Sequence, residues 1–87
     1  MNNYIELFRI VPKGDGYNYM CKNKSGQHYL EHKKNDNKDM LLFETESLAK
    51  EYIDTYLSMS DTMTLYVPEF ILYHKDYVPT NNIIKQI

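Results

Sequence analysis

The sharpest match to a catalytic pattern in this sequence is His28-Tyr29-Leu30-Glu31-His32, which reads H-x-x-E-H. On a helix, this spacing puts two histidine ligands and a general-base glutamate beside one zinc ion, as in inverted zinc metallopeptidases. Here Tyr29 and Leu30 favour a strand that follows a turn at Gly26. Residues four apart on a strand lie about 13 Å apart, whereas each zinc ligand lies about 2.1 Å from the metal. We therefore expect surface histidines and no metal site.

The other reactive side chains show no catalytic arrangement. Cys21 is the only cysteine, so no internal disulfide can form, and we expect a buried thiol because no motif supplies a base to activate it. The sequence contains no C-x-x-C, no G-x-x-x-x-G-K-[ST] and no G-x-G-x-x-G pattern. Acidic residues cluster at the start and on the solvent face of an expected helix, not in an apolar cleft. We expect neither a cofactor nor an enzyme activity.

Nine tyrosines are the unusual feature of the composition. A chain of 87 residues has too small a core to bury them all. Exposed tyrosines are enriched at protein–protein interfaces, and tyrosines interleaved with cations also stack on nucleic-acid bases. The residues that we expect to bind a partner lie in the N-terminal half of the chain: Tyr17, Tyr19, Tyr29, Lys22, Lys24, Lys33 and Lys34.

The elements that carry these residues are predicted to be three antiparallel strands. Residues 4–11 are apolar and β-prone, residues 17–22 alternate with Tyr17, Tyr19 and Cys21 on one face, and residues 27–32 form the third strand. Turns at 12–16 and 23–26, rich in Gly, Pro and Asn, separate these strands. We expect a three-stranded meander followed by an exposed polar loop over residues 33–39.

One amphipathic helix is predicted from about Glu46 to Ser58. Thr45 is placed to cap it, and apolar pairs recur every four residues from Leu48/Ala49 to Tyr56/Leu57. Residues 40–43 and 63–67 suit short strands, Pro68 must lie at an end or an edge, and residues 70–73 continue as a further strand.

The expected fold is therefore α+β, with a small antiparallel sheet covered on one face by the helix. The opposite face of the sheet should stay in water or meet a partner. We expect one domain over residues 1–78 and a loose tail over residues 79–87.

Composition and charge narrow the class of protein. Ten Lys and Arg against twelve Asp and Glu give a net charge of −2, which excludes a strongly basic nucleic-acid coat and a polyanionic DNA mimic. The first residues lack the basic and apolar regions of a signal peptide, and no apolar run approaches the length needed to cross a membrane, so we expect a cytoplasmic, reducing location. Residues 1–40 carry a net charge of +2 and residues 41–87 a net charge of −4.

In size and composition the chain is similar to small intracellular proteins of phages and mobile elements, such as anti-CRISPR and other anti-defence inhibitors, which share no common motif. This similarity implies a non-catalytic module that covers a surface of a larger host protein, such as a nucleic-acid-processing or defence enzyme. Two alternatives stay open: a nucleic-acid-associated domain that uses the basic strands, and a small metal protein or enzyme at His28 and His32. Pairing of an edge strand with a second copy, which would give a homodimer, is also open.

Overall fold

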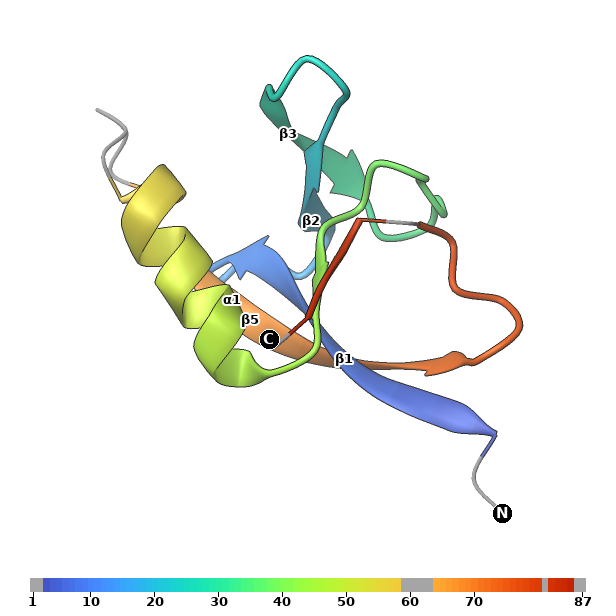
Figure 1. Ribbon diagram of the computed structural model, residues 1–87. Helices are drawn as coiled ribbons and strands as arrows, with labels where there is room; N and C mark the ends of the chain where they lie inside the picture. The colour runs from blue at the N-terminus through green and yellow to red at the C-terminus, as the bar shows by residue number, and fades with distance from the viewer. Residues whose placement is uncertain (1–2, 59–63, 81, 86–87) are drawn as a thin grey trace.

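The computed structural model describes residues 3–58, 64–80 and 82–85 and has an α+β fold (Figure 1). Its elements follow one another as β1 (Tyr4–Pro12), β2 (Asn18–Lys22), β3 (His28–His32), β4 (Leu42–Phe43), α1 (Glu46–Tyr52), which continues as the π-helical turn η1 (Ile53–Leu57), β5 (Tyr66–His74) and β6 (Ile83–Ile84). The predicted fold class is confirmed, and no described helix is long and apolar enough to cross a membrane.

The strands form two sheets, and the pairing of the first strand differs from the predicted meander. One sheet has the order β5-β1-β4-β6, and the second is the hairpin β2–β3. Strand β1 pairs along its whole length with β5, from Tyr4 opposite His74 to Pro12 opposite Tyr66. Its other edge pairs with β4 at Phe8 opposite Phe43. The neighbours of β1 in this sheet are therefore β5 and β4 and not β2, and the turn after Pro12 leads the chain into the second sheet.

The β2–β3 hairpin forms where the sequence predicts it. Its pairing runs from Asn18 opposite His32 to Lys22 opposite His28. The turn between the strands is closed by Asn23, whose Oδ1 accepts hydrogen bonds from the N–H groups of Ser25 (3.0 Å) and Gln27 (2.9 Å). Gly26 takes the positive φ of 85° that ends this turn.

The helix is also confirmed, together with its cap. Thr45 Oγ1 accepts a hydrogen bond from the Leu48 N–H at 3.1 Å, and Lys50 forms an ion pair with Glu46 one turn earlier at 2.9 Å. The last turn is wider, because the Ser58 N–H donates to the Ile53 carbonyl at 2.9 Å, an i→i+5 bond. This change of winding decides which apolar side chains at the end of the helix face inward.

The second half of β1 is covered on both faces, so the prediction that the face opposite the helix stays open is wrong there. On one face, Ile10 packs against the helix residues Ala49 and Tyr52. On the other face, Leu7 and Val11 pack in a second cluster, with side chains of the hairpin and with Met40 and Leu42. In Figure 1 the hairpin stands above the β1–β5 ribbon while α1 lies at its side. A strand that is apolar at successive positions is typical of burial on both faces.

The described residues of the C-terminal segment, 79–80 and 82–85, include a strand of the main sheet, whereas the sequence predicted a loose tail over residues 79–87. Strand β6 runs parallel to β4, with Ile83 opposite Leu42. Thr80 is buried, and its Oγ1 donates a hydrogen bond to the Lys38 carbonyl at 2.7 Å. The side-chain amide of Asn82 donates to the carbonyls of Lys22 and Asp39, each at 3.3 Å. The described part of this segment therefore ties the sheet to the hairpin.

Strand β5 replaces the two shorter strands that the sequence suggests, and it includes Pro68. It lies at the edge of its sheet, where proline is tolerated because it does not have to donate to a neighbouring strand. The predicted strand residue Met63 lies outside the described residues.

Candidate partner-binding surface

The three tyrosines expected to bind a partner have three different environments. Tyr17 is 68 % exposed, Tyr29 is half-buried, and Tyr19 is completely buried. The Tyr19 hydroxyl donates to the Asn35 carbonyl and accepts from the Asn37 N–H, and burial raises the pKa of Tyr19 to about 12. Tyr19 is therefore a core residue that fastens the polar loop, and its expected place on the surface is wrong.

Tyr29 is held in place by the same loop. Its hydroxyl donates to Asp39 Oδ2 at 2.8 Å and accepts from Asn37 Nδ2 at 3.0 Å. The hydrogen bond to the carboxylate of Asp39 is the main reason that the pKa of Tyr29 is raised to about 12. One part of Tyr29 also lines a hollow beside the helix.

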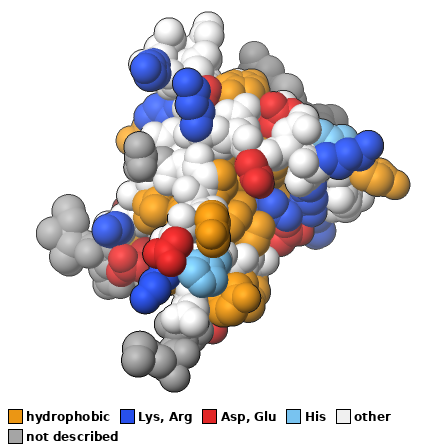
Figure 2. Space-filling view, turned by 90° about the vertical axis from the view of Figure 1, so that its right-hand side faces the viewer, with side chains coloured by type: hydrophobic (Ala, Val, Ile, Leu, Met, Phe, Trp, Pro, Cys, Tyr) orange, Lys and Arg blue, Asp and Glu red, His pale blue; other side chains and the backbone are white. Residues whose placement is uncertain are grey.

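The basic residues expected to bind a partner differ in their exposure. Lys24 and Lys34 are exposed, and Lys22 is half-buried. Lys22, Lys24 and Lys38 line one polar hollow of about 360 Å³ that also contains Asp39. Figure 2 shows basic side chains at the upper end of the molecule.

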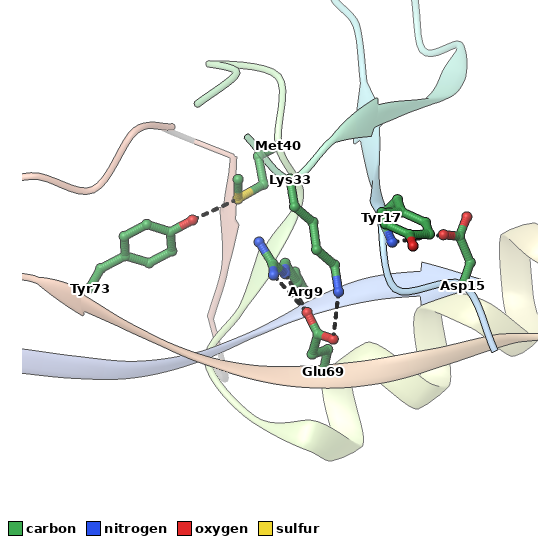
Figure 3. A network of polar contacts seen from close by, with 7 residues as sticks. All are labelled: Arg9, Asp15, Tyr17, Lys33, Met40, Glu69 and Tyr73. Atoms are coloured by element: carbon green, nitrogen blue, oxygen red, sulfur yellow. Dashed lines mark hydrogen bonds and ion pairs between the residues drawn. The ribbon is translucent and has the colours of Figure 1, made fainter. Parts of the chain in front are cut away.

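Lys33 lies in a three-residue ion-pair cluster with Arg9 and Glu69 (Figure 3). Glu69 on β5 accepts from Lys33 Nζ at 2.9 Å and from Arg9 Nε on β1 at 2.7 Å. Burial opposes ionisation of Glu69, but the two cationic donors outweigh burial, so the pKa of this carboxyl is lowered. The Arg9 guanidinium also lies 5.4 Å from the centre of the Tyr19 ring. The cluster fixes the loop after β3 to the main sheet.

The histidines of the H-x-x-E-H stretch lie at opposite ends of β3, as the prediction of a strand implies. His28 Nε2 is 2.6 Å from the Tyr52 hydroxyl, and burial lowers the pKa of His28. His32 Nδ1 accepts from the Lys34 N–H at 3.1 Å. Within residues 3–58, 64–80 and 82–85, no three His, Cys, Asp or Glu side chains are grouped to hold a metal ion.

Cys21 is completely buried in the cluster on the hairpin side of β1. Burial is the main cause that raises the pKa of its thiol to about 12. A thiol with this pKa is protonated at neutral pH and is a weak nucleophile.

A concave surface with mostly apolar walls lies between the hairpin and the end of the helix. A hollow of about 310 Å³, which we name the helix–hairpin hollow, opens there. Two exposed apolar side chains line it: Leu30 of β3, 41 % exposed, and Tyr56 of η1, 61 % exposed. The other residues that line it are Met20, His28, Tyr29, Leu57 and Tyr66.

Tyr56 also lines a second hollow, of about 410 Å³. This hollow includes Leu48 and Ile84 as apolar walls and Lys22 and Glu51 as charged ones. The Tyr56 ring packs on Tyr52 with centroids 4.6 Å apart. Tyr56 is therefore an exposed aromatic side chain, supported on one side and bordered by two hollows.

Sequence reasoning placed Tyr56 in the core stripe and did not identify it as a surface residue. A regular α-helix would turn Tyr56 and Leu57 inward together. In the π-helical turn more residues fill each turn, so Leu57 reaches the buried position and Tyr56 rotates toward solvent. The residue types and spacing of the Tyr56/Leu57 pair do not indicate a π-helical turn.

No protein-family model matches this chain, and no curated protein or solved structure is significantly similar to it.

Proposed function

We propose that this chain is a non-catalytic protein-binding module that holds its partner at the helix–hairpin surface, meaning the two hollows together with Leu30 and Tyr56. The observation that carries the proposal is the exposure of Tyr56 between two hollows with apolar walls. Interfaces use aromatic anchors that are surrounded by pockets from which a partner excludes water. Because Tyr56 already packs on Tyr52, binding costs less side-chain entropy than it would for a free ring.

The partner expected at this surface is a protein that inserts an apolar side chain beside Tyr56. The hollow next to Leu30 is lined by Met20, Leu57 and Tyr66, which offer apolar contacts, while His28 lies at one wall. On size and composition, we propose that the chain inhibits a larger host protein inside the cell by covering part of its surface. This is the mode of action of small phage and mobile-element inhibitors of the anti-CRISPR type.

Nucleic-acid binding is the second candidate function, and one observation favours it. Lys22, Lys24 and Lys38 line a common hollow and could contact phosphates there. Two observations weigh against it: Lys33 is paired with Glu69 on β5, and Asp39 lies in the same hollow. The net charge of −2 also opposes the approach to a polyanion.

Affinity purification from the source cells, followed by titration of the purified partner, tests the proposal. Tyr56→Ala should weaken binding about 30-fold, the effect expected of an interface anchor worth about 2 kcal/mol. Lys24→Glu should leave protein binding within about threefold. Binding that survives Tyr56→Ala, falls steeply with salt and is lost in Lys24→Glu would instead support nucleic acid as the partner.

A further inference from the structure

The outer edge of β5 is a second surface that can bind a strand, and its hydrogen-bonding groups can be assigned from the register. The Lys75 N–H donates to the Asn3 carbonyl, and the Lys13 N–H donates to the Leu65 carbonyl. These pairs continue the ladder in which Tyr4 lies opposite His74. Hydrogen-bonded and non-bonded pairs alternate in an antiparallel ladder, so the odd-numbered residues of β5 bond to β1. The even-numbered residues therefore point their N–H and C=O groups away from β1.

Proline occupies one of these outward positions, which separates the edge into two parts. Pro68 has no N–H, so the edge cannot donate there. Beyond it, Phe70, Leu72 and His74 follow as three successive outward residues that each carry both backbone groups. No described segment pairs with this edge, because β5 is the terminal strand of its sheet.

An apolar row accompanies this part of the edge on the face that β5 shares with the helix. Phe70 and Leu72 are each 51 % exposed. The row consists of Phe70, Leu72 and His74. The ring of Phe70 meets the ring of Phe8 on β1 edge to face, with centroids 5.7 Å apart, and the ring of His74 meets that of Tyr4 in the same way at 5.5 Å. Figure 2 shows hydrophobic side chains gathered around a histidine in the lower half of the molecule, toward the end where β1 begins in Figure 1.

We propose that a second copy of this chain occupies the edge, with its β5 antiparallel to the first and the two-fold axis at Leu72. In a two-fold symmetric dimer, if one residue faces a second residue of the other copy, that second residue also faces the first one of the other copy. In this register Leu72 faces Leu72 of the second copy, and Phe70 faces His74 of the second copy. The Phe8/Phe70 pair of one copy then lies beside the His74/Tyr4 pair of the other, since neighbouring strands are about 4.8 Å apart. One such row of four rings lies on each side of the two leucines.

Backbone groups and charges fit the same register. The outward N–H groups of Leu72 and His74 in both copies donate four hydrogen bonds across the axis. The carbonyl of His74 already accepts from the Tyr77 N–H at 2.9 Å and is therefore not counted for the Phe70 N–H. The register sets Glu69 opposite Lys75 of the second copy, which are of opposite charge, and it places no like charges face to face. A two-fold axis at Phe70 would instead set Leu72 against Pro68, which has no N–H to donate.

The dimer goes beyond the proposed function and does not depend on it. Its consequence is that one particle carries two helix–hairpin surfaces, which raises the avidity for a partner that presents two sites.

Sedimentation of the full chain over a concentration series tests the proposal. We expect a shift from 10.4 kDa toward twice that mass as the concentration rises. Leu72→Pro removes the outward N–H at the axis without removing a bond to β1, so it should keep the circular dichroism spectrum and sediment as a monomer. Leu72→Ala keeps the N–H and should weaken the dimer less.

Disulfide trapping gives an independent result if Leu72→Pro does not fold. Facing residues of a hydrogen-bonded pair have Cα atoms about 5.5 Å apart, which a disulfide can span. Leu72→Cys should therefore oxidise to a covalent dimer. The equally exposed Phe70→Cys should not, because four residues, about 13 Å along the strand, separate it from its copy. A chain that is monomeric at about 1 mM, or equal trapping at both positions, would overturn the proposal.

Discussion

Replacing Glu69 by glutamine tests how the loop after β3 is held on the main sheet. The substitution keeps the size of the side chain but removes the charge that Arg9 and Lys33 share. The Arg9 side chain is only 13 % exposed, so its cation would lose its partner in a largely dry environment. Hydrogen bonds to charged groups contribute about 1.5–3 kcal/mol each, and removing one partner of a buried ion pair costs about 3–5 kcal/mol. Because Glu69 is one-third exposed, solvent screening lowers this cost. We expect Glu69→Gln to reduce the free energy of unfolding by about 2 kcal/mol.

Glu46→Gln is the matched control, since Glu46 also forms an ion pair with a lysine, at 2.9 Å. Both partners of that pair are more than half exposed, and it lies within one turn of the helix, so its loss should cost less than about 0.5 kcal/mol. Urea unfolding at pH 7, followed by circular dichroism, measures both variants. Equal free energies of unfolding for Glu69→Gln and Glu46→Gln would refute the reasoning.

The pH dependence of the same variant gives a second measurement. The pKa of Glu69 is lowered in the folded chain relative to its ordinary value of 4.5. The stability that this carboxylate contributes is therefore fully present above pH 4.5 and is lost as the pH falls through the lowered pKa. The difference in stability between the parent chain and Glu69→Gln should shrink below pH 4.5. A difference that stays constant down to pH 2 would contradict the assigned role.

Three further predictions concern other parts of the fold. Cys21, with a thiol pKa raised to about 12 by burial, should react with Ellman's reagent only when the chain unfolds; fast reaction of the folded chain would contradict its burial. Burial lowers the pKa of His28 below 6.5, so the free energy of unfolding should fall as the pH drops from 6.5 toward that lowered pKa. Urea titrations at a series of pH values should show a smaller fall for His28→Gln. Asn82→Ala removes both hydrogen bonds to the hairpin side and should cost about 1–2 kcal/mol in urea unfolding, whereas a loose tail would show no change.

The elements that sequence reasoning predicted well depend on contacts between neighbours in the chain. Thr45 lies three residues before the N–H that it caps, and Asn23 closes its turn with residues 25 and 27. Such local patterns are visible in the order of residues alone. The H-x-x-E-H stretch was likewise assigned to a strand from its own side chains and the adjacent turn.

The pairing of β1 could not be derived in this way. Its partner β5 lies about 60 residues further along the chain, and nothing in the local pattern distinguishes that partner from the nearby β2. The prediction that one face of the sheet stays open failed for the same reason, since the hairpin covers it only because β1 pairs elsewhere. Tyr19 is buried as a consequence of this packing.

The candidate surface was only partly predictable. The abundance of tyrosine pointed to an interface, and Tyr29 does line the helix–hairpin hollow. Tyr56, which we consider its main anchor, has the spacing of a core residue and becomes exposed only through the wider turn at the end of the helix.

Site-specific photocrosslinking in the source cells tests the central claim, that a protein partner binds at the helix–hairpin surface. A benzophenone amino acid is placed at Tyr56, at Leu30 and, as the control, at Tyr77, which is 77 % exposed and does not line either hollow. We predict that Tyr56 and Leu30 give a crosslink to the same protein, distinct from a second copy of this chain, and that Tyr77 does not. Crosslinks to that protein from Tyr77 alone, or crosslinks from Tyr56 and Leu30 only to nucleic acid, would contradict the account.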